Sequence, residues 1–175
     1  MSRQEPREGS KSGAVIDSLQ FAREGGRKEG LVPVAALERL VDVLADNAGE
    51  LAWQVKGERD GEGKSWLWLS VQGSLNLRCQ RCLEAVPYSL DIASRLLLVP
   101  PGGPWPEDLQ DGGLADDESD AIAASTELGL LPLVEEEVLL TLPIAPMHES
   151  CQPPSAAGLE QEPSPFAALA KIQKH

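Results

Sequence analysis

The stretch SWLWLSVQGSLNLR, residues 65–78, alternates apolar and polar side chains over nearly its whole length. Such alternation is typical of a β-strand with one buried face, because successive side chains of a strand point to opposite sides. We therefore predict one long strand here. Its expected core face comprises Leu67, Leu69, Val71, Gly73, Leu75 and Leu77. Its expected outer face comprises Trp66, Trp68, Ser70, Gln72, Ser74, Asn76 and Arg78.

The segments on both sides of this stretch alternate in the same way. They are ELAWQVKGE, residues 50–58, and VPYSLDIASRLLLV, residues 86–99. GERDGEGK, residues 57–64, has the composition of a hairpin loop between the first two runs. The link between the second and third runs contains CQRCLEA. The three runs therefore predict an antiparallel meander sheet.

Two other segments repeat apolar residues at helical spacing. Residues 33–49 begin with a proline, which suits a first helical turn, and end in Asp-Asn-Ala-Gly. Residues 127–143 carry Pro132 near the start and Pro143 at the end. We predict that both are helices covering the sheet. The expected core-facing residues are Val34, Leu37, Leu40, Val41 and Leu44 in the first, and Leu131, Val134, Val138 and Leu142 in the second.

The second predicted helix contains three consecutive glutamates, residues 135–137. Neighbouring helical positions point about 100° apart, so the carboxylates do not converge on one ligand, and we expect a solvated face. Nearer the N-terminus, AVIDSLQFA, residues 14–22, predicts a short strand that EGGRKEG, residues 24–30, interrupts.

The chain has 175 residues, of which 42% are apolar, and this suits one domain with a real core. We predict a single α+β domain over residues 14–151: an antiparallel meander sheet of three or more strands covered by helices, with a disordered acidic insert at residues 100–126. Residues 1–13 are expected to be disordered, and residues 152–175 to form a Pro-rich tail with a short terminal helix. No apolar run is long enough for a membrane helix or a secretory signal.

The charge is strongly negative and concentrated in one part of the chain. Lys and Arg number 15 against 28 Asp and Glu, for a net charge of −13. Residues 100–150 contain twelve acidic residues and no Lys or Arg. Two interpretations remain open: a solvated, self-repelling segment, or an acidic surface that attracts a basic partner. The residues of this acidic surface would be Glu107, Asp108, Asp111, Asp116, Asp117, Glu118 and Asp120.

Three cysteines and one internal histidine form two closely spaced pairs, C-x-x-C at 79–82 and H-x-x-C at 148–151. Together, Cys79, Cys82, His148 and Cys151 could close one structural, tetrahedral Zn²⁺ site. The residues alone leave other interpretations open: ordinary reduced thiols, a redox dithiol, or an iron–sulfur cluster. A redox dithiol is disfavoured because this C-x-x-C does not open a helix after a strand.

Two tryptophans lie on the outer face of the long predicted strand. If exposed, Trp66 and Trp68 could stack on RNA bases beside Arg78 and Arg81. The alternative is that a helix or strand packs over this second face. The net negative charge argues against a tight, sequence-independent grip on RNA.

Catalytic motifs are absent from the sequence. It contains no glycine-rich phosphate loop after a strand and no G-x-S-x-G, and its two histidines are His148 and the terminal His175. A Ser-His-Asp or Cys-His catalytic site would therefore have to be built on His148 alone.

Two segments in this order resemble the bacterial YceD family, also called the large ribosomal RNA subunit accumulation protein family. The first is LRCQRCLEAVPYSLDI; the second is ELGLLPLVEEEVLLTLPIAPMHESC, followed by SPFAALAKI. The resemblance implies a cytoplasmic factor needed for normal synthesis, processing or stability of 23S ribosomal RNA, without a known enzymatic activity.

The leading hypothesis is therefore a non-enzymatic accessory factor in large-subunit biogenesis. We expect it to act through a basic ribosomal protein or assembly factor, with any contact to rRNA indirect. A direct RNA-binding module is the alternative, and an RNA-processing enzyme is a weaker third. We expect no cofactor other than one structural Zn²⁺.

Overall fold

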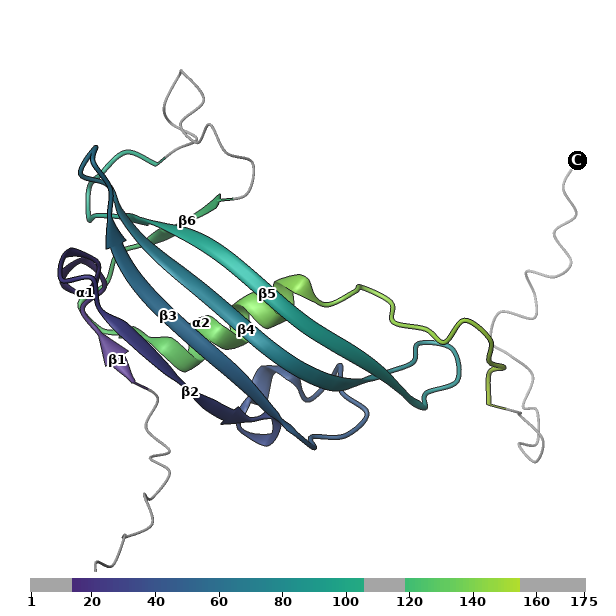
Figure 1. The fold of residues 1–175 in the computed structure, drawn as a ribbon. Helices are drawn as coiled ribbons and strands as arrows, with labels where there is room; N and C mark the ends of the chain where they lie inside the picture. The colour runs from purple at the N-terminus through teal and green to yellow at the C-terminus, as the bar shows by residue number, and fades with distance from the viewer. Residues whose placement is uncertain (1–13, 106–118, 155–175) are drawn as a thin grey trace, which may run out of the picture.

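The computed structural model describes residues 14–105 and 119–154, and a five-stranded sheet forms its centre (Figure 1). The strand order is β2-β3-β4-β5-β6, antiparallel except for the last pair. The strands are β2 (Arg27–Pro33), β3 (Glu50–Arg59), β4 (Ser65–Arg78), β5 (Ala85–Val99) and β6 (Ser119–Ala123). The smaller elements are β1 (Val15–Ile16), α1 (Ser18–Arg23), the 3-10 turns η1 (Val34–Ala36) and η2 (Glu38–Leu40), β7 (Leu128–Gly129) and α2 (Leu130–Thr141).

The predicted antiparallel meander is confirmed by β3, β4 and β5, whose bounds agree closely with the three alternating runs. In β4, all five predicted core residues with side chains are at most 2% exposed. Gly73 lies among them with φ +154°, and a Cβ there would be 2.6 Å from the Leu51 side chain. The alternation along β4 therefore identifies the face of the sheet that is buried.

The helix predicted over residues 127–143 is confirmed as α2, which lies across one face of the sheet (Figure 1). Val134 and Val138 are fully buried, and Leu131 and Leu142 pack at the margin of the core. The preceding β7 pairs with β1, and this pairing places the start of the helix beside the N-terminal segment.

The solvated face predicted for the three glutamates is wrong for two of them. Glu135 and Glu137 are only 9% and 7% exposed, and Glu136 alone is exposed. The Glu135 carboxylate accepts the backbone N–H of Arg39 at 2.6 Å, and the Glu137 carboxylate accepts the Ser94 hydroxyl. Because these donors replace water, both carboxylates can be buried between the helix and its neighbours.

The helix predicted over residues 33–49 is also wrong, although most of its apolar residues are buried. The segment forms two 3-10 turns, separated at Leu37 by a non-helical backbone (φ −95°, ψ 82°). It then pairs with the end of β4: Ala45 N–H bonds to Asn76 O at 2.8 Å, and Arg78 N–H bonds to Val43 O at 2.9 Å. Since β3 does not pair with β4 beyond Gly73, this pairing satisfies backbone groups that a helix would leave open. Val41, expected in the core, is 60% exposed.

The N-terminal part contains a helix and a strand that the sequence pattern missed. Instead of one strand over residues 14–22, β1 leads into α1, whose N-cap Asp17 accepts the Gln20 N–H at 2.9 Å. The segment 24–30, interpreted as a break, contributes the start of edge strand β2. Its exposed, charged residues gave no apolar alternation to detect.

The predicted insert at residues 100–126 is structured at its C-terminal end. There β6 pairs with β5 in parallel, from Arg95↔Ser119 to Val99↔Ala123. Residues 106–118 lie outside the described part, as do the expected disordered N-terminus and most of the Pro-rich tail. Within residues 14–105 and 119–154, every helix falls short of the length and apolar character needed to cross a membrane.

Candidate metal centre

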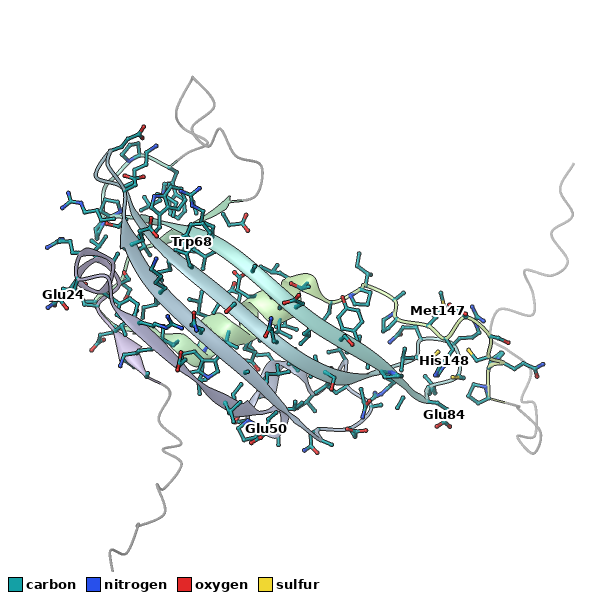
Figure 2. The ribbon with its side chains drawn as sticks, in the orientation of Figure 1. Glu24, Glu50, Trp68, Glu84, Met147 and His148 are labelled. Carbon is teal, nitrogen blue, oxygen red and sulfur yellow. The ribbon has the colours of Figure 1, made fainter. Side chains whose placement is uncertain are left out.

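The two predicted ligand pairs meet at one end of the molecule. One pair lies in the β4–β5 hairpin loop, and the other lies in the extended segment after α2, near Met147 and Glu84 in Figure 2. The hairpin closes through Cys79 N–H to Glu84 O (2.9 Å) and Leu83 N–H to Cys79 O (3.0 Å). Gln80 N–H donates to Pro146 O at 2.8 Å, which ties the two segments together.

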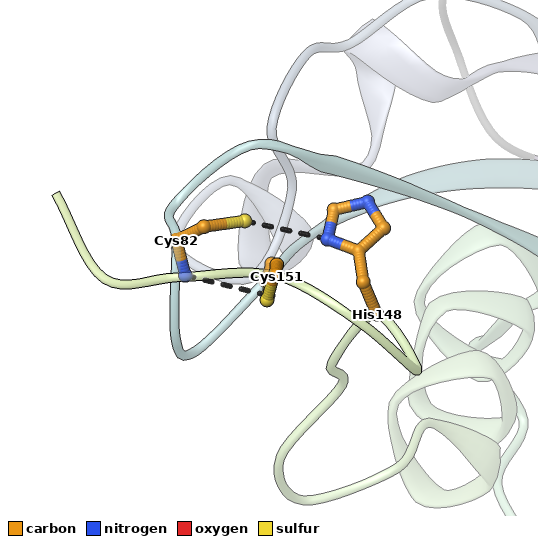
Figure 3. Close-up of side chains that lie close together, drawn as sticks. Cys82, His148 and Cys151 are labelled. Carbon is orange, nitrogen blue, oxygen red and sulfur yellow. Dashed lines mark hydrogen bonds between the residues drawn. The ribbon is translucent and has the colours of Figure 1, made fainter.

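The four predicted ligand atoms lie within 4.8 Å of one another. Cys79 Sγ is 3.8 Å from Cys151 Sγ, and Cys82 Sγ is 3.3 Å from His148 Nδ1, as the dashed line in Figure 3 shows. Zn–S bonds of about 2.3 Å in a tetrahedron separate two sulfur ligands by about 3.8 Å. The spacing therefore fits a four-coordinate ion, with all four positions supplied by protein.

The ring of His148 presents the nitrogen that a metal requires. His148 Nε2 lies 3.1 Å from the backbone oxygen of Ala85, which can only accept a hydrogen bond. Nε2 therefore carries the proton in the neutral ring, and the lone pair is on Nδ1, facing Cys82. A backbone carbonyl commonly orients a metal-ligating histidine in this way.

Backbone donors surround the sulfur of Cys79. Arg81 N–H and Cys82 N–H point at it from 3.4 and 3.5 Å. Burial, the largest single influence, raises the pKa of the Cys79 thiol. The donors around the sulfur outweigh burial and lower this pKa to about 5. At Cys151, burial and the neighbouring cysteines raise the thiol pKa.

This polarity suits a cation more than a free thiol cluster. One sulfur is stabilised as a thiolate, while a neighbouring sulfur resists ionisation beside it. A bound divalent cation would reverse that resistance and hold all three cysteines as thiolates, because the ion's own charge dominates the site. The donor set of three sulfurs and one imidazole is one that zinc prefers.

The two arginines expected to contact RNA have backbone partners. Arg78 Nη2 donates to Leu44 O at 3.0 Å. Arg81 Nη1 donates to Cys151 O at 3.3 Å, and its Nη2 lies 3.8 Å from Met147 Sδ. Both arginines therefore brace the β4–β5 hairpin loop and the segments that pack against it.

The sequence left open whether Trp66 is exposed or packed, and its side chain is only 4% exposed. The Arg95 guanidinium lies over the Trp66 ring, 4.0 Å from the centroid. The indole Nε1–H of Trp66 donates to the Asp60 carboxylate at 2.8 Å. Trp68, labelled in Figure 2, is 42% exposed and lies 5.1 Å from the same guanidinium. Of the two tryptophans, only Trp68 is open to a partner.

Strand register reveals a row of residues that sequence reasoning missed. Arg27 lies opposite Lys56, Lys56 opposite Trp68, and Trp68 opposite Arg95. The row therefore places Lys56 and Arg95 on the two strands beside the exposed ring of Trp68, and Arg27 one strand beyond Lys56. Its charge is moderated by ion pairs from Arg27 to Glu29 (3.4 Å) and from Lys56 to Glu58 (3.3 Å). Only the strand register could have identified this row.

One of the seven predicted acidic surface residues can be placed. Asp120 is exposed on β6, where its charge helps to raise the pKa of Glu137. The other six lie within residues 106–118, outside the described part of the chain.

Comparison with known proteins identifies relatives. The family model for "Large ribosomal RNA subunit accumulation protein YceD" matches residues 67–173. The Haemophilus influenzae protein of that name is 29% identical, over 91% of this chain and 95% of its own length. Bacillus subtilis "Uncharacterized protein YlbN" is 31% identical, over 61% of this chain and 58% of its own length. No solved structure matches the chain.

Proposed function

Because this chain belongs to the YceD family of large ribosomal RNA subunit accumulation proteins, we propose that it is a non-enzymatic accessory factor in large ribosomal subunit biogenesis. It acts in the cytoplasm and supports the synthesis, processing or stability of 23S rRNA. The observation that carries this proposal is the family match over residues 67–173, which spans both halves of the metal centre.

The metal centre supports a structural role within this function. Cys79, Cys82, His148 and Cys151 would hold one Zn²⁺, and a closed site leaves no open position for substrate. When bound, the ion supplies cross-linking: it joins the β4–β5 hairpin to the segment that leaves α2. The site then rigidifies one end of the sheet without taking part in a reaction.

The acidity of the chain supports a basic protein as the direct partner. Residues 100–150 carry a net charge of −12, counting Asp, Glu, Lys and Arg. Such a segment would steer a basic ribosomal protein or assembly factor to this surface, and it would repel the phosphates of rRNA. The function on rRNA is then indirect.

Direct RNA binding is the second candidate, and the exposed ring of Trp68 favours it. Lys56 and Arg95 lie on the strands beside that ring, with Arg27 one strand further, and a base could stack on the ring. Arg78 and Arg81 would contribute positive charge at the far end of the sheet, although their backbone contacts limit their reach. Trp66 is too buried to stack on a base.

Cells that lack the gene provide the test of the main proposal. We expect a lower ratio of 23S to 16S rRNA than in the parent strain, restored by the wild-type gene. A tagged pull-down analysed by mass spectrometry and RNA sequencing should recover a basic large-subunit protein. An unchanged rRNA ratio with normal ribosome profiles would contradict the proposal.

The same pull-down separates the two candidates. If the protein binds RNA directly, Trp68→Ala should remove the co-purifying RNA while leaving the fold intact, and purified protein should bind RNA with a strong salt dependence. Leu31→Ala, at an exposed apolar residue on β2, is the control. If the RNA still co-purifies with Trp68→Ala, but is lost when the protein partner is removed, the protein contacts rRNA only through that partner.

A further inference from the structure

At the end of the sheet away from the metal centre, a groove lies between α1, the β3–β4 hairpin and the end of β5. We propose that this groove binds a phosphate monoester carried on an apolar body of nucleotide size. The inference does not depend on the ribosomal role, because it rests on the lining of the groove alone.

The floor of the groove is apolar. Leu19 of α1 lines it together with Leu98 and Val99 of β5, and Pro100 and Pro104 follow on the chain. The volume is about 400 Å³, within the range of pockets that hold small organic ligands. A bare inorganic ion would leave this floor exposed to water, so the ligand must bring an apolar part that covers it.

The rim of the groove is positive in a chain that is strongly negative overall. Arg23, Arg59 and Lys64 line it, against one acidic residue, Glu62. The chain as a whole has 28 acidic residues and 15 Lys and Arg. A local reversal of sign beside an apolar floor selects an anionic ligand.

Arg23 and Arg59 have side-chain N–H groups that no hydrogen bond within the described residues uses. Within the described residues, Arg23 makes no hydrogen bond or ion pair through its side chain. Arg59 donates Nε–H to Gly63 O at 3.2 Å, and this bond leaves the two terminal nitrogens of its guanidinium available. Lys64 pairs with Glu62 at 3.0 Å, but that pair is exposed and therefore weak.

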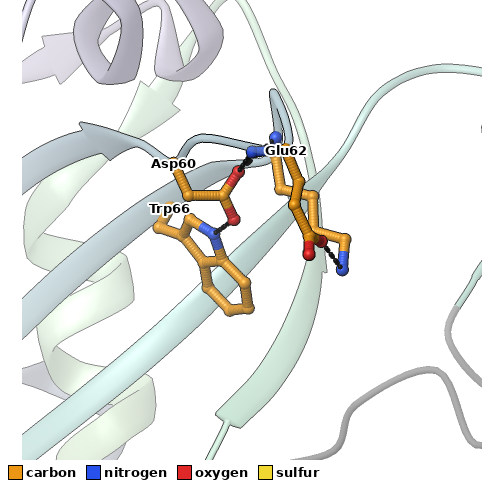
Figure 4. Close-up of polar contacts among 4 residues, drawn as sticks. Asp60, Glu62 and Trp66 are labelled. Atoms are coloured by element: carbon orange, nitrogen blue, oxygen red, sulfur yellow. Dashed lines mark hydrogen bonds and ion pairs between the residues drawn. The ribbon is translucent and has the colours of Figure 1, made fainter.

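The hairpin that carries the rim is held in shape before any ligand arrives. The Asp60 carboxylate accepts the N–H groups of Glu62 (3.0 Å) and Lys64 (2.9 Å), and it also accepts the indole N–H of Trp66 (2.8 Å), as Figure 4 shows. The Trp66 bond is the main cause that lowers the pKa of Asp60. An ionised Asp60 therefore fixes the turn, and a preformed site spends less binding free energy on ordering.

The chemistry of the rim indicates phosphate. Two guanidinium groups and one ammonium match a doubly charged phosphate monoester, since arginine bonds phosphate oxygens in a bidentate manner. A nucleoside of the right size would lay its base over the leucine and proline floor. The phosphate monoester has two sources in a cell: a free nucleoside monophosphate, or the 5′-monophosphate end of an RNA chain.

Isothermal titration of the full-length protein, purified without chelator, tests the proposal and separates the sources. We expect AMP or UMP to bind at least tenfold more tightly than the corresponding nucleoside or inorganic phosphate. Tighter binding of a 5′-phosphorylated hexaribonucleotide than of AMP, with loss of binding by its 5′-hydroxyl counterpart, identifies an RNA end. Equal or weaker binding of the hexaribonucleotide identifies the free nucleotide.

Variants at the rim complete the test. The double variant Arg23→Gln/Lys64→Gln should weaken AMP binding at least tenfold without lowering the thermal midpoint, because both side chains are exposed. Lys28→Gln/Arg39→Gln removes the same charge from exposed positions outside the groove and should leave binding unchanged. The proposal is overturned if no nucleotide binds at millimolar concentration, or if both double variants weaken binding equally. The rRNA ratio is measured separately, so failure here leaves the ribosomal proposal intact.

Discussion

The Nε2 contact of His148 with the Ala85 carbonyl determines which ring nitrogen faces the three cysteines. That single contact directs the Nδ1 lone pair towards the cysteines, as a fourth metal ligand would require. The cysteines differ among themselves, because the backbone donors converge on Cys79 and not on Cys151. The metal centre is therefore asymmetric at the level of single residues, and its ligands should respond differently to substitution.

The first prediction concerns the metal ligands. Protein purified without chelator should carry about one equivalent of Zn²⁺ by elemental analysis. Cys79→Ser and Cys151→Ser should each lose it, because each removes a thiolate whose charge and bond to Zn²⁺ a water molecule does not replace. His148→Ala should weaken binding less, because water can occupy the position of the neutral imidazole, as it does in catalytic zinc sites. Ser150→Ala, an exposed neighbour, is the control and should keep the full equivalent.

Chelation provides the corresponding stability measurement. When the free ion concentration is about a thousandfold above the dissociation constant, binding stabilises the fold by about 4 kcal/mol. Its removal should therefore lower the thermal midpoint on the order of 10 °C. Metal-free protein with an unchanged midpoint and freely titrating thiols would contradict a zinc centre.

The second prediction concerns Glu137. Burial raises the pKa of its carboxyl above 4.5, and the charges of Asp120 and Glu136 add to this effect, whereas the bond from Ser94 opposes it. The folded state therefore takes up the proton more readily than the unfolded state. The charged carboxylate costs stability above the folded-state pKa, and that cost disappears as the pH falls below 4.5.

Glu137→Gln should remove this pH-dependent cost, because the amide carries no charge and its oxygen can still accept the Ser94 hydroxyl. The thermal midpoint at pH 7 should equal or exceed that of the wild type, and the midpoint should change less between pH 7 and pH 4.5. Glu127→Gln is the matched control, because Glu127 is exposed and its charge is not among the causes that raise the pKa of Glu137. A variant that is clearly less stable at pH 7 would show that the ionised form stabilises the fold.

At the scale of elements, the contact between α1 and β3 depends on a glycine. A Cβ at Gly57 would lie 2.5 Å from Phe21 O and 2.7 Å from Ala22 Cα. These are backbone atoms and cannot rotate away, so the helix would have to shift. Gly57 N–H also donates to Gly26 O at 2.8 Å, which holds the turn after α1 against the sheet.

The third prediction follows from this contact. Gly57→Ala should destabilise the protein by about 1–3 kcal/mol, the range typical of overpacking, as measured by denaturant titration. Gly61→Ala is the control, because a Cβ there meets no atom within 4 Å. Equal stability of the two variants would mean that α1 does not pack against β3 as described.

At the scale of the whole molecule, charge is distributed unevenly. The acidic residues concentrate between positions 100 and 150, while the groove at the hairpin end and the outer face of the sheet carry cations. The chain therefore carries charges of both signs, which can attract ligands of opposite charge. A basic protein would meet the acidic segment, and a phosphate would meet the groove.

The fourth prediction concerns that acidic segment. Asp116→Asn/Asp117→Asn/Glu118→Gln should weaken association with a basic partner and flatten its salt dependence, without changing the thermal midpoint. Glu38→Gln/Asp42→Asn/Glu50→Gln removes the same charge from exposed positions elsewhere and is the control. If both triple variants lose association equally, the total charge of the protein determines binding. If neither variant loses association, the acidic segment is only solvated.

The three central strands and α2 were predictable from the sequence alone. In β4, the alternation of leucine and valine with polar residues extends over fourteen positions, so both the strand and its buried face follow from local pattern. Pro132 and Pro143 bracket α2 for equally local reasons. The four candidate metal ligands and their pairwise spacing were also visible, because chelation by a C-x-x-C or H-x-x-C pair is a local property.

What lies between those elements was decided by tertiary structure. The apolar stripe of residues 34–44 fits a helix, but the unpaired end of β4 offers hydrogen bonds that pull the chain into 3-10 turns and a bridge at Leu44↔Leu77. Glu135 and Glu137 are buried because Arg39 N–H and the Ser94 hydroxyl, distant in sequence, supply donors. The ligand atoms of the two pairs lie within 4.8 Å of one another. They can do so because α2 lies across the sheet, so that the segment after it runs to the β4–β5 hairpin (Figure 1). Local periodicity carries no information about such long-range contacts, since their partners lie far along the chain.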